Sequence, residues 1–361
     1  MRSLRKEATT FQAEARRRPV LRYQPTLAQL TPALVERFEL MHCDAETAEF
    51  IEAASYINVA TIALADALHF MLSRTTANGL VGRGFMFVLS TAQACQLLRP
   101  AGLAHADYRA RLAPLLATPS APAPCRIDVA ETEAAPQAAA PAAPKPRGPT
   151  GADVLQLLGP DAPRFKRLLD IGAGDGGVTA KLAPMAEEVF VTEVSMSMRW
   201  RLRRRGYTVL PHENPFEEID PATRQPRAAQ YDLIALNNVL DRTDKPRTLL
   251  QDIHSALTPD GFFLLAVVLP WCPFVEAGKT QRRPTEPLPM EGGECCAGAG
   301  FEASVNRLMD NVLAPMGFEL VRWTKLPYIC QGNLDVAYSL LHDAVLVLRR
   351  REGAVAREEM W

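Results

Sequence analysis

Residues Asp170 to Gly177 combine acids with closely spaced glycines directly after an apolar run, which makes this stretch well suited to hold a ligand. The apolar run at 168–171 predicts a buried strand, and a glycine-rich turn lets the backbone lie close to a ligand. Glu193 ends the next apolar run, about twenty residues beyond the turn, where an acid accepts hydrogen bonds from ribose hydroxyls. The spacing therefore indicates a site for a ligand that contains a nucleoside.

Two kinds of cofactor fit the glycine spacing. Gly172, Gly174 and Gly177 match the G-x-G-x-x-G pattern that binds a dinucleotide pyrophosphate. Asp170 and Asp175, however, put two negative charges where a pyrophosphate would lie, and like charges repel. A zwitterionic sulfonium ligand suits the turn better. The D-x-G-x-G-x-G form resembles motif I of the Rossmann-like S-adenosylmethionine methyltransferases, and a nucleotide oxidoreductase is the alternative.

Apolar runs alternate with helical patterns on both sides of this turn, which predicts an α/β fold with a mostly parallel, doubly wound sheet. With an antiparallel last strand, the expected arrangement resembles the Rossmann-like class I methyltransferase fold with seven strands, here preceded by an N-terminal helical layer. Ligands bind such sheets at the carboxyl ends of the strands, so Asp170, Glu193, Asn237 and Asn238 should meet at one edge. The expected strands are 168–171, 189–192, 208–210, 231–236, 262–269, 318–328 and 343–349, with helices at 196–205, 246–257 and 301–316.

Composition divides the chain into five parts. Residues 1–25 form an Arg-rich disordered tail, and 26–115 form the N-terminal helical region, in which a glycine-rich lid loop spans Thr75 to Gly84. Residues 116–150 are rich in Ala and Pro and bury too little surface to fold, so they are expected to be a disordered insertion. The methyltransferase domain is expected at 151–350, followed by a tail at 351–361. The apolar stretch 56–72 contains polar residues and therefore predicts a buried helix instead of a membrane span.

Charge and cysteine content exclude several classes of function. The net charge of −1 provides no overall field to attract nucleic acid. The seven cysteines are scattered without a C-x-x-C pair, so the sequence indicates neither a metal site nor a disulfide framework. The N-terminus lacks the apolar core of a secretory signal. We expect an intracellular, cytoplasmic monomer, with an organelle address left open.

Several stretches together resemble one family, the DREV methyltransferases, also called methyltransferase-like protein 9, which are protein-histidine N-methyltransferases. The resemblance spans residues 57–349 apart from the Ala/Pro-rich insertion. The matching stretches are Thr76-Ala77-Asn78-Gly79-Leu80-Val81-Gly82-Arg83-Gly84, Met86-Phe87-Val88, 168–176, Asn238-Val239-Leu240-Asp241-Arg242, Leu269-Pro270 with Pro273, Leu326-Pro327-Tyr328 and Asp343-Ala344-Val345.

The resemblance implies S-adenosyl-L-methionine as cofactor and peptides with a His-x-His sequence, x being small, as substrates. The methyl group goes to the ring nitrogen nearest the main chain, called pros or N1. The sequence departs from the family pattern at one place. The family has two adjacent tyrosines before the final strand, whereas this chain has Tyr338-Ser339, so one contact to the peptide is in question. The implied cofactor contacts are Asp170, Gly172, Gly174 and Glu193, to which we add Ala173, Val194, Asn214 and Asn237; the implied substrate contacts are Asn238, Asp241 and Tyr328.

The chemistry of histidine explains how these contacts could select the nitrogen that reacts. Neutral imidazole has one N–H and one lone pair, so the nitrogen that donates its proton to an acceptor leaves the other free to react. If Asp241 or the Asn238 amide accepts the distal N–H, the pros nitrogen faces the methyl group.

Structural roles are the alternatives for these three residues. Asn238 could cap a helix, Asp241 could pair with Arg242 or Lys245 on the surface, and Tyr328 could be a core residue. A methyltransferase with another acceptor and a catalytically inactive scaffold are the alternative functions.

Overall fold

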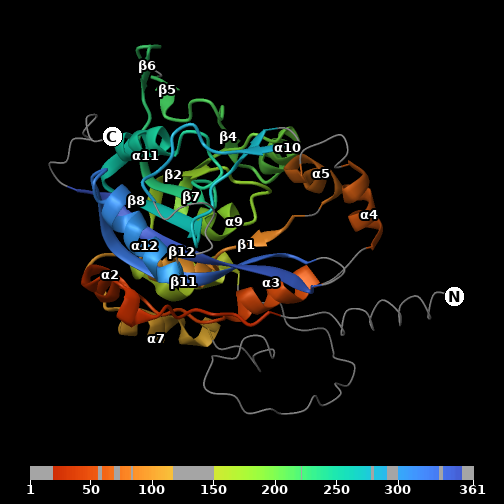
Figure 1. Cartoon of the computed structure of the whole chain (residues 1–361). Coiled ribbons are helices and arrows are strands. Elements are labelled where there is room, and N and C mark those ends of the chain that lie inside the picture. Colours follow the sequence, from red (N-terminus) through yellow and green to blue (C-terminus); the bar gives the residue numbers. More distant parts are fainter. Residues whose placement is uncertain are drawn as a thin grey trace, which may run out of the picture.

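The computed structural model describes residues 19–55, 59–68, 74–82, 84–116, 150–220, 222–277, 280–290, 300–332 and 336–351. The expected insertion at 116–150 lies almost wholly outside the described residues, as do most of the N-terminal tail and the C-terminal tail beyond residue 351. The described parts before and after the insertion pack together around one sheet (Figure 1).

The central sheet has eight strands, and its order confirms the expected fold class. Five neighbouring strands, from β8 through β7, β2 and β3 to β4, are parallel, while β12 is antiparallel to β8 and to β11. The short strand β1 adds an eighth strand at the edge beside β11, which the sequence did not predict as part of the sheet. In sheet order the strands are β1 (Met86–Phe87), β11 (Phe318–Gln331), β12 (Tyr338–Arg350), β8 (Leu257–Val268), β7 (Tyr231–Asn237), β2 (Phe165–Ile171), β3 (Ala186–Thr192) and β4 (Thr208–Val209).

The helices expected at 196–205, 246–257 and 301–316 are present with nearly the expected bounds. Residue Ser90 caps α6 through a capping box with Gln93. A π-helical segment and the positive φ of Gly317, 86°, end the helix expected at 301–316. The helices of this part are α6 (Thr91–Leu97), α7 (His105–Leu116), α8 (Gly151–Leu158), η3 (Gly159–Asp161), α9 (Thr179–Leu182), η4 (Ala183–Met185), α10 (Met196–Arg204), α11 (Pro246–Ala256), α12 (Phe301–Arg307) and η5 (Leu308–Leu313).

The N-terminal helical layer differs from the sequence prediction in one important place. The stretch expected as a glycine-rich lid loop contains the helix α5 (Arg74–Val81), and only Gly82 and Gly84 after it have positive φ. The helix forms because it packs against α4 (Val59–Leu68) and α10, and these contacts offset the poor helix propensity of Gly79. The layer begins with η1 (Leu27–Gln29), α2 (Pro32–Arg37) and α3 (Ala45–Ser55).

Helix α4 was expected to be buried, but Leu64 on it is 53% exposed, so part of the helix faces solvent. Among the described residues, no helix is both long enough and apolar enough to cross a membrane. Cys43 is disulfide-bonded, a pairing that the sequence did not predict, whereas Cys95 and Cys330 are free thiols.

The sheet has an apolar core on each face. On one face, Leu236 and Leu346 pack with side chains of α11 and α12. On the other face, Leu168 and Val345 pack with side chains of α6, α7 and α8, among them Leu112. The N-terminal helices therefore complete the core of the methyltransferase domain.

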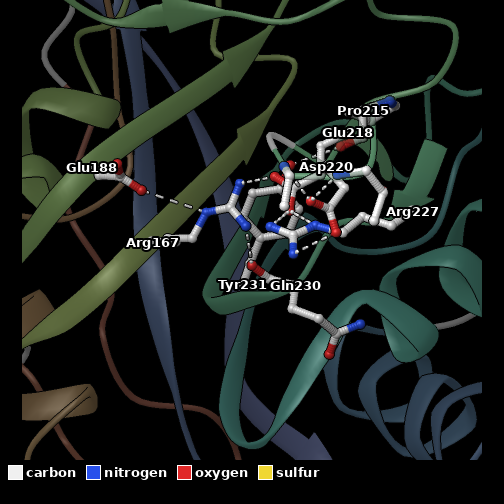
Figure 2. Close-up of polar contacts among 10 residues, drawn as sticks. Arg167, Glu188, Pro215, Glu218, Asp220, Arg227, Gln230 and Tyr231 are labelled. Carbon is white, nitrogen blue, oxygen red and sulfur yellow. Dashed lines mark hydrogen bonds and ion pairs between the residues drawn. The ribbon is translucent and has the colours of Figure 1, made fainter. Parts of the chain in front are cut away.

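Two small hairpins lie outside the main sheet. The hairpin β5 (Glu217–Ile219) and β6 (Pro226–Ala228) projects from the body of the molecule above α11 (Figure 1), and the second consists of β9 (Val275–Ala277) and β10 (Thr280–Arg282). Arg167 on β2 anchors the first hairpin, because its guanidinium donates to Glu218 over 2.7 Å and lies on the ring of Tyr231 (Figure 2). This network lies at the edge of the sheet where β2 and β7 begin.

Candidate active site

The turn after β2 contains three glycines with positive φ. Gly172, Gly174 and Gly176 have φ values of 71°, 57° and 80°, in the left-handed region where a side chain is strained. The amides of Gly172 and Ala173 donate to the side chain and the carbonyl of Thr192, over 3.2 Å and 2.9 Å. These bonds fix the turn against the end of β3.

The carboxylate of Glu193 links the glycine turn after β2 to the segment after β3. One carboxylate oxygen accepts the N–H of Gly174 over 2.9 Å, and the other accepts the N–H of Ser195 over 2.8 Å. The side chain is largely buried, yet each oxygen has a second lone pair for a hydroxyl donor. The neighbouring Val194 is 71% exposed and offers apolar surface beside the carboxylate.

Asp170 lies fully buried beneath the turn and holds two neighbouring elements. Its carboxylate accepts the hydroxyl of Thr179 over 2.6 Å and the amide N–H of Asn237 over 3.3 Å. Burial raises the pKa of Asp170 to about 6, a rise that these hydrogen bonds oppose and the charge of Glu193 increases. The acid thus ties α9 and the end of β7 to the turn.

The segment after β7 packs directly on the glycine turn. Asn238 has a φ of 58°, and its backbone N–H donates to Ala266 on β8 over 2.9 Å. A Cβ placed on Gly172 would come within 2.5 Å of a methyl group of Val239. Asn238 caps no helix, since residues 239–242 form a turn. The side of the site that carries Asn238 is therefore in contact with the motif I turn.

Two buried acids lie beside Asn238. The amide nitrogen of Asn238 donates to Asp343 on β12 over 2.8 Å, and Asp241 forms an ion pair with Arg242 over 2.7 Å. This ion pair is not on the surface, because the side chain of Asp241 is 2% exposed. Burial raises the pKa of both acids, and the charge of Asp241 raises that of Asp343 further. One oxygen each of Asn238, Asp241 and Asp343 is buried without a hydrogen-bond partner among the described residues.

Tyr328 belongs to the same cluster. Its hydroxyl donates to the sulfur of Met86 on β1 over 2.6 Å. Burial raises the pKa of Tyr328, and Cys330, Asp343 and Asp241 contribute to the rise. The terminal methyl of Met86 would lie 3.6 Å from a Cβ on Gly174, so Met86 connects the tyrosine to the glycine turn.

The structure does not bring Asn214 to this cluster. Asn214 is exposed and lines a separate cavity of about 480 Å³ with side chains of α11 and the β5–β6 hairpin, among them Asp252 and Arg227. The adjacent carbonyl of Pro215 accepts the hydroxyl of Tyr231, which begins β7 at the opposite edge of the sheet. The expectation that Asn214 binds the cofactor is therefore corrected.

Tyr338, at the departure from the family pattern, has a structural role. It is fully buried, and its hydroxyl donates to the carbonyl of Pro19 over 2.6 Å. Ser339 beside it is exposed.

The residues at the carboxyl edge fit S-adenosylmethionine. The turn offers backbone without Cβ atoms at Gly172 and Gly174, and Glu193 offers acceptors for ribose hydroxyls. The amide oxygen of Asn237 is buried without a partner among the described residues, so it can accept an N–H of the amino-acid end. These acceptors suit a ligand with hydroxyl and ammonium donors.

Two residues of the cluster received no role in the sequence analysis. Asp343 and Met86 both lie in stretches that resemble the DREV family, but their contacts depend on pairings across the sheet. Asp343 lies 105 residues from Asn238 in the chain and meets it only because β12 and β7 flank β8.

Comparisons with known proteins give one curated relative and two solved structures to which parts of the chain are similar. A non-reducing polyketide synthase of Aspergillus terreus is 30% identical over 135 residues, which are 35% of this chain and 5% of that protein, so the chain spans a small part of this relative. The N-methyltransferase NodS of Bradyrhizobium japonicum, solved with S-adenosylhomocysteine, is 17% identical, with coverages of 52% of this chain and 80% of that chain and a TM-score of 0.30. The 1,6-didemethyltoxoflavin-N1-methyltransferase of Burkholderia thailandensis is 21% identical, with coverages of 53% and 72% and a TM-score of 0.34.

The match to a family model extends much further. The model described as DREV methyltransferase matches residues 22–113 and 158–350, on both sides of the Ala/Pro-rich insertion. The chain therefore belongs to the DREV methyltransferase family, whose members are S-adenosylmethionine-dependent enzymes.

Proposed function

We propose that the protein is a protein-histidine N-methyltransferase that forms 1-methylhistidine, modified at the pros nitrogen, in His-x-His sequences with a small central residue. The supporting observation is the group of buried oxygens on Asn238, Asp241 and Asp343 that have no partner among the described residues. Buried acceptors without donors are costly, so a ligand with an N–H group would be bound here. An imidazole has such a group, and its methylated product is a cation that the acids stabilise.

The acceptors determine which nitrogen reacts. At pH 7 most histidine is neutral, since its ordinary pKa is about 6.5, so no strong base is needed. When Asn238 or Asp241 accepts the distal N–H, the lone pair of the pros nitrogen is free. When bound, S-adenosylmethionine supplies a methyl group on a positively charged sulfur. Holding nucleophile and methyl group in line contributes roughly 7–11 kcal/mol.

Negative charge on the buried acids would stabilise the methylated imidazole, which is a cation. The ring becomes cationic as the nitrogen–carbon bond forms, and fixed carboxylates stabilise that charge. Burial raises the pKa of Asp241 above its ordinary value, so Asp241 is able to take the distal proton from the product. Arg242 opposes this rise and holds the carboxylate in place over 2.7 Å.

The cofactor would lie along the motif I turn. In this proposal Glu193 binds the ribose, Val194 packs beside the adenine, and Asp170, the turn residues and Asn237 hold the amino-acid end. Peptides with His-x-His sequences are the proposed partners, and the cytoplasmic location, the monomeric state and the absence of nucleic-acid binding remain predictions of the sequence.

The test is product analysis after incubation with labelled S-adenosylmethionine and a His-Ala-His peptide. We expect 1-methylhistidine from the wild type and roughly hundred-fold slower formation of it by Asp241→Asn. Asp310→Asn, an exposed acid on η5, serves as the matched control and should leave the rate unchanged. Exclusive formation of 3-methylhistidine, the distal isomer, would contradict the proposal.

The same assay separates the alternatives. Turnover of a small molecule or another side chain, with an inert His-x-His peptide, would favour a different methyltransferase. Absence of S-adenosylhomocysteine binding in calorimetry would favour an inactive scaffold.

A further inference from the structure

The contact between Asp343 and Asn238 joins two strands that are not neighbours in the sheet. Asp343 lies on β12 opposite Val268 of β8, and Asn238 follows β7 on the other side of β8. Asp343 is fully buried, and its carboxylate accepts the Asn238 side-chain amide over 2.8 Å. The contact therefore brings a buried acid to the back of a residue that faces the proposed substrate.

In the structure the nitrogen end of the Asn238 amide faces the carboxylate of Asp343. An ionised carboxylate accepts hydrogen bonds and donates none, so it binds the nitrogen end of the Asn238 amide. The oxygen end must then point away from Asp343. That oxygen is buried and has no partner among the described residues, which leaves it open to an N–H donor.

The backbone of Asn238 leaves little other freedom. Its N–H donates to the carbonyl of Ala266 over 2.9 Å, and its φ of 58° is held in the left-handed region. The main chain is thus fixed to β8, and the remaining variable is which end of the amide faces outward. Asp343 determines that variable.

We propose that Asp343 is a positioning residue that holds the oxygen of the Asn238 amide toward the substrate imidazole and thereby selects the pros nitrogen for methylation. This inference rests on the proposed function. The outward oxygen accepts the distal N–H and leaves the pros lone pair free. An inverted amide would donate an N–H to the distal nitrogen, and the proton would then lie on the pros nitrogen and block its reaction.

The first variant is Asp343→Asn, which keeps size and shape but can present either an oxygen or an NH₂ group to Asn238. The Asn238 amide can then invert. We expect kcat for pros methylation to fall roughly ten- to hundred-fold, as for loss of a hydrogen bond to a charged group, with S-adenosylhomocysteine affinity unchanged. The product that remains should still be 1-methylhistidine, because the distal nitrogen stays hydrogen-bonded to Asn238 and does not reach the methyl group.

The second variant exchanges the two side chains, as Asn238→Asp/Asp343→Asn. A carboxylate at position 238 accepts the NH₂ of the new amide with one oxygen and keeps the other oxygen as an outward acceptor. We expect this double variant to recover most of the rate of pros methylation that Asp343→Asn loses, which a purely structural role for Asp343 would not predict. Asp310→Asn again provides the control for an unrelated acid.

Each result has a defined meaning. A wild-type rate of 1-methylhistidine formation by Asp343→Asn would overturn the inference, as would a folded double variant that shows no recovery of this rate. If the wild type methylates no histidine peptide at all, the proposed function fails. Urea unfolding of Asn238→Asp, Asp343→Asn and the double variant then tests the pairing by itself. Recovery of stability in the double variant supports the fixed amide, and its absence refutes it.

Discussion

Gly172→Ala should be unusually damaging, because two independent costs meet at this position. The φ of Gly172 is 71°, and a residue with a side chain pays about 1–2 kcal/mol for that conformation. The added Cβ would also lie 2.5 Å from a methyl group of Val239, and overpacking of this kind costs about 1–3 kcal/mol. Together the free energy of unfolding should fall by about 2–5 kcal/mol.

Gly174→Ala is the matched control, because it has the same backbone requirement without the overlap. Its φ is 57°, and its Cβ would meet its nearest neighbour, a methyl carbon of Met86, at an ordinary 3.6 Å. We expect a loss of only about 1–2 kcal/mol, the cost of backbone strain. Urea unfolding at pH 7 measures both variants.

Val239→Ala tests the steric part directly. In the Gly172→Ala background it should restore the part of the loss due to overlap, so the two substitutions should be coupled by about 1–3 kcal/mol. Equal destabilisation by Gly172→Ala and Gly174→Ala, or full additivity with Val239→Ala, would refute the claim that the motif I turn rests on the segment after β7.

Three further predictions concern the acids. Burial raises the pKa of Asp170 from 3.8 to about 6, so the folded chain holds a proton that the unfolded chain has lost between these pH values. The unfolding free energy of the wild type should therefore fall relative to Asp170→Asn by about 2 kcal/mol from pH 4 to pH 7, and a constant difference in urea unfolding would contradict the shift. Glu193→Gln should weaken S-adenosylhomocysteine binding in calorimetry by roughly ten-fold or more, since the amide replaces one of two oxygens that accept turn N–H groups; an unchanged Kd would show that the carboxylate is dispensable. Asp241→Asn should lower kcat roughly hundred-fold while leaving that Kd unchanged, and parallel loss of both would show that cofactor and substrate roles are not divided as proposed.

The strands and the turn of the methyltransferase domain could be predicted because their signals are local. Apolar runs that end in an acid or an asparagine predicted β2, β3 and β7, and their parallel pairing then brought Asp170, Glu193 and Asn237 to one edge. The glycines likewise predicted a turn after β2, and the structure has left-handed backbone there at Gly172 and Gly174.

The failures come from contacts between distant parts of the chain. Helix α5 was expected as a loop because Gly79 and its neighbours are poor helix formers, whereas packing on α4 and α10 decides its structure. Asn214 was expected among the cofactor contacts, but the chain there turns back toward the start of β7. Asp343 received no role because its pairing with Asn238 spans a strand between them.

The location of the N-terminal helices bears on how the protein can be shortened. A recombinant fragment that starts at Thr150 would keep the motif I turn and the acids of the candidate site. It would lack α6 and α7, however, and would expose part of the apolar core around Leu168 and Val345 to water. It would also lack Met86 against Tyr328. Such a fragment should aggregate, and any trimmed version for crystallisation has to retain the stretches on both sides of residues 117–149.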